Sequence, residues 1–230
     1  MGLSVVFVHH QIECAPRCWA KVADQLKEID RHRPGNSETA LYGIWRSQIG
    51  LPRDTITMIS KWPNADMAKS GTAQIHNQLG LVKSYAATLM TPTLRPENTK
   101  PPERQGNYAF RWFTTPTEKF EEFLSLCKEA WPSFESSYDS QIIGLWRLAN
   151  SLPHSSHKQF GVENDDNIST VLLTRRPDLS MWERSKIPQT AEEIETRQKL
   201  SRRYNLCDQT MVFTTTLLTA SDQNDDVSWA

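Results

Sequence analysis

The stretch Leu41–Ala68, LYGIWRSQIGLPRDTITMISKWPNADMA, decides the fold because its central motif occurs twice in the chain. Gly43-Ile44-Trp45-Arg46 returns 101 residues later as Gly144-Leu145-Trp146-Arg147. Residues 57–63 (TMISKWP) correspond in the same way to residues 171–177 (VLLTRRP), at an offset of 114. The larger second offset requires an insertion in the second copy, and the polar residues at about 151–166 provide it. Internal similarity of this kind indicates two copies of one structural unit.

Both copies show the same order of secondary structure. In the first copy, β-rich runs at 5–11, 41–47, 54–62 and 81–91 predict strands, and helices are expected at 15–31 and 65–78. In the second copy, strands are expected at 108–114, 141–149, 168–175 and 210–219. Its helices follow residue 115 and span 179–204, with an interruption near Pro188. Each copy is therefore a β-α-β-β-α-β unit, which forms a four-stranded antiparallel sheet with both helices on one face.

The uncovered faces of the two sheets predict how the copies assemble. Residues 1–95 form the first ferredoxin-like repeat, 96–106 a linker rich in proline and charge, and 107–220 the second repeat, with a flexible acidic tail at 221–230. Large apolar residues on a bare sheet must be covered. We therefore expect an α+β protein whose two repeats pack sheet to sheet as an α/β barrel, with the helices outside. A cavity between the sheets would be a natural small-molecule site.

The stretch 41–68 also resembles the NIPSNAP family, within the dimeric α/β-barrel (ferredoxin-like) superfamily. The second copy shares the Gly144 and Trp146 feature and departs from the family pattern after it. The resemblance implies the barrel fold, in a superfamily of cofactor-free oxygenases that act on electron-rich aromatics, haem enzymes, aldoxime- or lactone-processing enzymes and non-catalytic ligand binders. The features that carry it are Gly43, Trp45, Gly50, the strand that ends at Trp62, the helix that holds Asp66, and the Leu89–Pro92 end of the domain.

The composition argues against several classes of partner and favours a cytoplasmic location. The 230 residues include 26 Lys and Arg against 27 Asp and Glu, so the chain has no basic excess for nucleic acid. No apolar run approaches the roughly 18 residues of a membrane helix, and the first residues make a poor signal peptide, so a cytoplasmic protein is expected. Nine glycines without a phosphate loop argue against a nucleotide cofactor, and no metal site is expected. A fused pair needs no partner, but free sheet edges leave a homodimer open.

His9 and His10 are the first candidate catalytic residues. They are adjacent on the first strand, so one points to the inner face of the sheet and the other toward the helices. An imidazole in an apolar cavity can take a proton from a bound phenol or enol at neutral pH. The sequence does not decide which of the two has this role.

Arginines and tryptophans on the strands complete the candidate site. Arg111 stands between Phe110 and Trp112 and is the third candidate catalytic residue, since an arginine in the cavity would orient an anionic oxygen. Strand alternation sends a tryptophan and the arginine after it to opposite faces, which favours surface positions for the two repeated arginines. The candidate substrate-binding residues are Trp45, Arg46, Trp62, Trp112, Trp146 and Arg147.

These residues favour an enzyme that acts on a small apolar or aromatic metabolite in the cavity between the sheets, without a nucleotide cofactor. An oxygenase, an isomerase and a lyase all remain open. The first alternative is a non-catalytic ligand-binding or interaction protein. The second is a haem-binding protein, with His76 on the second helix as the candidate ligand.

Overall fold

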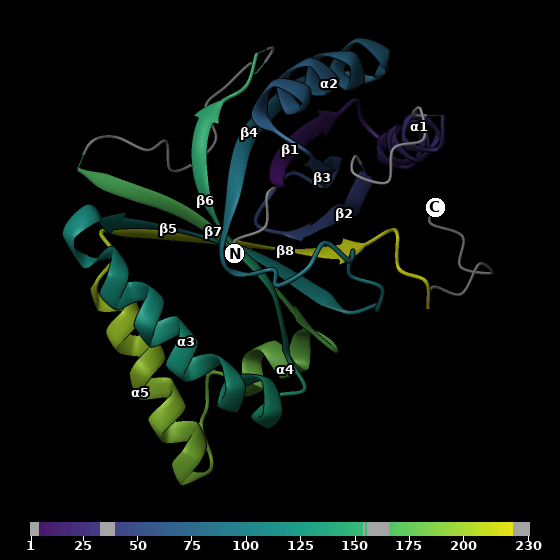
Figure 1. The fold of residues 1–230 in the computed structure, drawn as a ribbon. Helices are drawn as coiled ribbons and strands as arrows, with labels where there is room; N and C mark the ends of the chain where they lie inside the picture. Colours follow the sequence, from purple (N-terminus) through teal and green to yellow (C-terminus); the bar gives the residue numbers. More distant parts are fainter. Residues whose placement is uncertain (1–4, 33–39, 154, 156–165, 223–230) are drawn as a thin grey trace.

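The structure, a computed structural model, describes residues 5–32, 40–153, 155 and 166–222. Within these residues the first half of the chain has the order β-α-β-β-α-β, and the second half has the same order with its second helix divided in two (Figure 1). The first half contains β1 (Val6–Cys14), α1 (Trp19–Arg31), β2 (Ala40–Ile49), β3 (Thr55–Trp62), α2 (Ala65–Gln78) and β4 (Val82–Arg95). The second contains β5 (Asn107–Pro116), the 3-10 turn η1 (Thr117–Lys119), α3 (Phe120–Ser137), β6 (Gln141–Ser151), β7 (Asn167–Arg176), α4 (Leu179–Arg184), α5 (Ala191–Asn205) and β8 (Gln209–Leu217).

The eight strands form one closed barrel in the order β1-β3-β2-β8-β5-β7-β6-β4. All the pairs are antiparallel, and the two halves are joined by β2 with β8 and by β4 with β6. The α+β barrel with outer helices is therefore confirmed. The expectation of free sheet edges is wrong, because each outer strand of one half hydrogen-bonds to an outer strand of the other.

Side chains from all eight strands fill the interior of the barrel. This barrel core includes Phe7, Trp45, Phe110, Trp112, Trp146 and Phe213, all at most 2% exposed. Their rings pack closely: Trp112 and Phe213 have centroids 4.9 Å apart, and Trp45 and Phe110 have centroids 5.2 Å apart. The expected space between the sheets is therefore occupied by an aromatic core in the described part of the chain.

The repeated glycine–tryptophan motif has a steric cause. Trp45 lies over Gly43 and Trp146 lies over Gly144, two residues earlier on the same face of each strand. A Cβ at Gly43 would lie 2.4 Å from the Trp45 ring, and one at Gly144 would lie 2.3 Å from the Trp146 ring. Only glycine leaves room for the indole, so the motif is a packing device of the barrel core.

Gly144→Ala is expected to destabilise the protein by about 1–3 kcal/mol, the usual cost of overpacking a core. The rigid Trp146 ring cannot move away from the new methyl group without disturbing its neighbours. Urea unfolding measures the change, and Gly80→Ala is the matched control because the nearest atom to its Cβ would be 3.7 Å away. Equal stability of the two variants would contradict this explanation of the motif.

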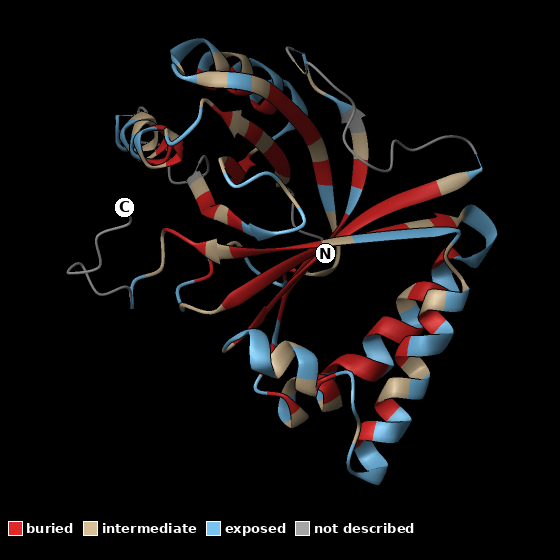
Figure 2. Cartoon of the chain, turned by 180° about the vertical axis from the view of Figure 1, so that it is seen from behind, coloured by how far each residue is buried: buried red, intermediate tan, exposed pale blue. Residues whose placement is uncertain are grey.

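The helices cover the outside of the barrel. The first-half core beneath α1 and α2 contains Trp62, whose ring lies against Gly71 of α2. Trp62 therefore faces the helices rather than the barrel interior, and its expected inner position is wrong. Over the second half, α3 and α5 lie side by side, while the short α4 precedes α5 (Figure 1). Figure 2 shows buried and exposed residues alternating along α3 and α5, as in helices that cover a sheet.

Some predictions fall in the connecting segments. Residues 96–106, the predicted linker, contain no helix or strand between β4 and β5. The predicted insertion at about 151–166 and the predicted flexible tail at 221–230 lie largely outside the described residues. None of the described helices is long and apolar enough to cross a membrane.

Candidate functional site

The two histidines of β1 lie in different environments. The ring of His9 is inside the barrel, 5.6 Å from that of Phe110 and 5.2 Å from that of Trp112 between centroids. His10 points outward, where its Nδ1 is 2.7 Å from the Tyr85 hydroxyl and its Nε2 is 2.8 Å from the Ser60 hydroxyl. Both histidines are fully buried. His9 thus occupies the inner position foreseen for an acid/base, but among packed aromatic rings.

Tyr85→Phe is expected to lower the free energy of unfolding by about 1–3 kcal/mol, because it removes a hydrogen bond to the buried Nδ1 of His10. Chemical denaturation measures the change. The variant should bind small molecules as the wild type does, because His10 of β1 and its partners on β3 and β4 lie in the wall of the first half. A normal stability with altered ligand binding would instead support a functional role for His10.

The predicted arginines do not converge on one site. The guanidinium of Arg46 lies over the ring of Trp19 in α1, 4.5 Å from its centroid, on the outer face of the barrel. Arg147 is exposed. Their partners in the motif, Trp45 and Trp146, lie in the barrel core. These positions follow the expected alternation along each strand, with the arginine outside and the tryptophan inside.

Arg111 lines a pocket outside the barrel wall. Its neighbours Phe110 and Trp112 belong to the barrel core, whereas Arg111 itself points toward the helices. The pocket has a volume of about 220 Å³. It lies between the outer face of β5, β6 and β7 on one side and the helices α3, α4 and α5, with the residues that follow α4, on the other. We call it the helix-side pocket. It is lined by Arg111, Trp131, Phe134, Ile142, Leu172, Thr174, Arg176, Trp182, Ser185, Lys186, Arg197, Leu200, Arg203 and Tyr204.

The charge of this pocket is one-sided. Four arginines and one lysine line it, and no aspartate or glutamate does so within the described residues. Lys186 pairs with Glu183 at 2.7 Å. None of the four arginines has a described carboxylate within ion-pair distance; they are Arg111, Arg176, Arg197 and Arg203. Such an arrangement can accept an anion.

A capping box lies at the start of α5, the helix that carries two of the pocket's arginines. The Thr190 hydroxyl accepts a hydrogen bond from the backbone N–H of Glu193 at 3.2 Å, and the Glu193 carboxylate accepts one from the N–H of Thr190 at 3.3 Å. This capping box fixes the start of the helix. The same carboxylate pairs with Arg184 at 2.6 Å. The buried acid of α5 is therefore neutralised by Arg184 outside the pocket lining.

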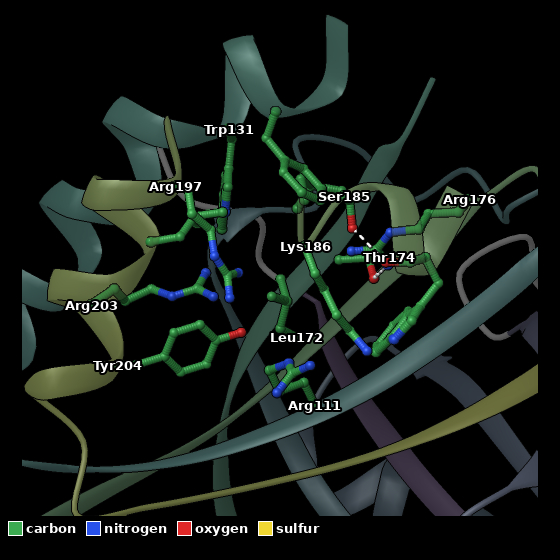
Figure 3. Close-up of a pocket in the computed structure, with 14 residues that line it drawn as sticks. Arg111, Trp131, Leu172, Thr174, Arg176, Ser185, Lys186, Arg197, Arg203 and Tyr204 are labelled. Atoms are coloured by element: carbon green, nitrogen blue, oxygen red, sulfur yellow. Dashed lines mark hydrogen bonds between the residues drawn. The ribbon is translucent and has the colours of Figure 1, made fainter. Parts of the chain in front are cut away.

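Aromatic rings hold the pocket's cations in place. The Arg176 guanidinium lies 4.4 Å from the Trp182 ring centroid, and that of Arg203 lies 5.0 Å from the Tyr204 centroid. Arg111 lies near both rings, at 5.7 Å and 5.4 Å. Figure 3 shows Arg197, Arg203 and Tyr204 entering from α5 on one side and Lys186 and Arg176 on the other. Cation–π contacts of this kind orient arginines without neutralising them.

The electrostatics of the pocket shift several pKa values. Burial, and then the charge of Arg111, lower the pKa of Arg176 to about 10. Burial also lowers the pKa of Arg111, and the nearby Arg203 and Arg197 add to this effect. Burial by itself raises the pKa of the Tyr204 phenol, but the positive charges of Arg203, Arg111 and Arg197 outweigh it, and the net effect lowers that pKa. The pocket therefore favours negative charge.

Most of these residues escaped sequence reasoning, although the signal was present. On β7, Thr174 and Arg176 occupy helix-facing positions where an apolar residue is usual. On α5, Arg197, Leu200 and Tyr204 share one face because they are three and four residues apart. Cations on the face of a helix that packs against a sheet indicate a polar pocket. Of the predicted site residues, only Arg111 lies in it.

Haem does not fit the pocket as described. Haem iron needs an axial ligand, and among the described lining residues Tyr204 is of a type that can ligate it, whereas no histidine, cysteine or methionine lines the pocket. His76, the predicted ligand, lies on α2 with its ring 5.0 Å from that of Tyr85, away from the pocket. A volume of about 220 Å³ is below the range of roughly 300–1,000 Å³ that is usual for sites of drug-sized ligands. The size of the pocket therefore decides against haem.

Comparison with known proteins places the fold. No protein-family model and no curated protein matches the sequence. A Lactobacillus acidophilus protein provisionally named a monooxygenase is similar in structure, with a TM-score of 0.58, 11% identity and 93% of each chain covered. An anthrone oxidase-like protein has a TM-score of 0.58 at 8% identity, with 96% of this chain and 94% of the other covered.

A chlorite dismutase variant from Candidatus Nitrospira defluvii has a TM-score of 0.56 at 8% identity, with 94% of this chain and 92% of the other covered. At such identities the likeness concerns the fold alone. The chain has the dimeric α/β-barrel fold of monooxygenase-like and chlorite dismutase-like proteins, with the barrel closed by its own two halves.

Proposed function

We propose that this protein is an enzyme that binds a small anionic aromatic metabolite in the helix-side pocket and transfers a proton to or from it. The proposal rests on one observation: arginines line a pocket with aromatic walls, and no described residue supplies a carboxylate to that lining. An anion supplies the missing countercharge, and the apolar walls accept its ring. The similar structures named as a monooxygenase and as anthrone oxidase-like make an aromatic substrate reasonable for this fold.

Tyr204 is the proposed acid/base and Arg111 the residue that holds the developing oxyanion. In this step the Tyr204 phenolate oxygen takes a proton from an acidic O–H or C–H bond of the substrate. The electron pair of that bond stays on the substrate as a phenolate or enolate, next to Arg111 and Arg176. Buried cations stabilise such a charge strongly, because water does not screen them. An isomerase, a lyase and an oxygenase can all begin with this step, so the reaction type stays open.

Para-nitrophenol tests this proposal, because its phenolate is coloured and reports its own ionisation. The bound dye is expected to ionise at lower pH than the free dye, by about one pKa unit or more, as for an acid beside arginine. Absorbance titration with and without protein measures this shift.

Arg197→Gln should reduce the shift, while Arg202→Gln on the same helix should not. Arg202 is the matched control because it is 65% exposed and lies 3.7 Å from Glu122. A dye that does not bind, or that ionises at higher pH when bound, would overturn the proposed function.

The barrel interior is a second candidate site, favoured by donors within the aromatic core. The indole Nε1 atoms of Trp45, Trp112 and Trp146 are buried and make no hydrogen bond to a described residue. A small molecule that carries acceptors would lie among them beside His9 after the packed rings move apart, either as the substrate of the predicted strand histidine or as a ligand that is only bound. Under this alternative, His9→Phe abolishes dye binding and Arg197→Gln leaves it unchanged.

We also propose that the protein is a member of the NIPSNAP family, because residues 41–68 resemble that family. We also propose that the protein works in the cytoplasm, without a tightly held cofactor. A homodimer is not needed to complete the barrel, because both halves belong to one chain. Sedimentation of the full chain tests the oligomeric state.

A further inference from the structure

The cations of the helix-side pocket fall into two groups. Around Trp182, the Arg176 guanidinium lies 4.4 Å and the Lys186 Nζ lies 5.7 Å from the ring centroid. Beside Tyr204, the Arg203 guanidinium lies 5.0 Å from the ring centroid, and Arg197 joins this group as a lining residue of the same helix. Arg111 contacts both rings and therefore belongs to both groups. A ligand with one anionic group can pair closely with only one of them.

Both groups contain a buried donor that has no acceptor. Arg176 is 8% exposed and Arg203 is 3% exposed. The Nε atom of each is buried and makes no hydrogen bond to any described residue. One Nη atom of Arg176 donates to Thr174 Oγ1 at 3.3 Å and one of Arg203 donates to Cys127 Sγ at 3.6 Å, but no described carboxylate lies within ion-pair distance of either guanidinium. An anionic group of a ligand can therefore pair with each of them. The two guanidiniums belong to different groups, which indicates a ligand with two anionic groups.

The volume between the two groups limits the ligand's size. An apolar cavity of about 150 Å³ is enough for benzene. The helix-side pocket, at about 220 Å³, has room for one aromatic ring and a few further atoms. Its apolar lining includes Trp131, Phe134, Leu172 and Leu200, which can contact the faces and edges of such a ring. A fused polycyclic molecule would not fit without movement of the helices.

We infer that the ligand is a single aromatic ring that carries two anionic groups, one held by Arg176 and Lys186 and the other by Arg197 and Arg203. This inference rests on the proposed function and specifies its substrate class. The shared chemistry is a benzene ring with two carboxylates or with one carboxylate and one other acidic oxygen. Arg111 lies between the two groups and contributes to the binding of both.

Calorimetric titration at low ionic strength tests this inference. The probes are the three isomeric benzene dicarboxylates, benzoate with one carboxylate, and succinate with two carboxylates but no ring. At least one benzene dicarboxylate is expected to bind about tenfold or more tightly than both benzoate and succinate, since charge-assisted pairs form at both ends of the pocket. In Arg176→Met the ratio to benzoate should fall close to one, because benzoate can still use the remaining group.

The outcomes separate the inference from the proposed function. Benzoate that binds as tightly as every dicarboxylate would overturn the requirement for two anionic groups, while the proposed function would stand. Succinate that binds as tightly would overturn the requirement for a ring. If none of the probes binds, the proposed function fails as well. Circular dichroism of Arg176→Met establishes that the variant is folded, and Arg202→Gln should keep the wild-type ratio.

Discussion

Arg176→Met is expected to stabilise the ligand-free protein by about 1–3 kcal/mol, while it weakens the binding of a dicarboxylate to the level of benzoate. Arg176 is buried, and burial together with the charge of Arg111 lowers the pKa of Arg176 to about 10, so the folded state carries a charge that its surroundings disfavour. Methionine keeps an apolar stem of similar length beside Phe134 and Trp182 and removes the charge. Denaturant unfolding at neutral pH measures the gain.

The pH dependence gives this result a second signature. A base whose folded pKa is lowered destabilises the fold while it is charged, and this cost disappears as pH rises through the folded pKa toward the unfolded value. The advantage of Arg176→Met should therefore be complete at neutral pH and shrink as the pH rises above about 10.

Arg203→Met is the control of opposite sign. Burial lowers the pKa of Arg203, but Cys127 and Tyr204 outweigh that effect and raise it. Its guanidinium also lies 4.8 Å from the Phe113 ring centroid. We expect this variant to be less stable than the wild type. If Arg176→Met is instead less stable than the wild type, the surroundings of Arg176 favour its charge and this explanation of its lowered pKa is wrong.

Tyr204 is expected to be the first tyrosine of the protein to ionise. The chain contains five tyrosines. Burial raises the pKa values of Tyr42, Tyr85, Tyr108 and Tyr138, whereas the arginines of the helix-side pocket lower that of Tyr204. Near-ultraviolet absorbance of phenolate should therefore show one group that titrates below pH 10 and four that titrate above it.

Tyr204→Phe should remove the early phase and leave the late one intact. An acid whose folded pKa is lowered adds stability as pH rises through that pKa toward the unfolded value. Unfolding of the wild type, compared with Tyr204→Phe, should show this gain below pH 10. A saturating anion in the pocket should shift the early phase to higher pH, because it neutralises the arginines around the phenol. An early phase that survives in Tyr204→Phe would contradict the assignment.

The sequence predicted the elements well because their signals are local. The helix predicted from Asn64 starts there. The Asn64 side chain accepts a hydrogen bond from the backbone N–H of Met67 at 2.9 Å, and α2 spans Ala65–Gln78. The helical stretch expected at 179–204 is divided around Pro188 into α4 and α5, as predicted. Capping and proline restrict the backbone within a few residues, so a single sequence reveals them.

The position of the site could not be predicted in the same way. Alternation along β5 sets Arg111 opposite Phe110 and Trp112, but it does not say which face holds a cavity. The three inner tryptophans suggested space between the sheets, yet they fill it, because Gly43 and Gly144 let two of the indoles lie flat against their strands. The pocket depends on how α3, α4 and α5 meet over the second half of the barrel. That arrangement depends on contacts between residues far apart in the chain, such as Arg111 with Trp182.

The most direct test of the central claim is a crystal structure of the protein with a brominated benzene dicarboxylate, in which the anomalous signal locates the bromine atom. The account predicts one strong peak in the helix-side pocket, with one carboxylate beside Arg176 and the other beside Arg197 and Arg203. A bromine peak beside His9 in the barrel interior would contradict the account. So would a peak at full occupancy on the surface with no peak in the helix-side pocket.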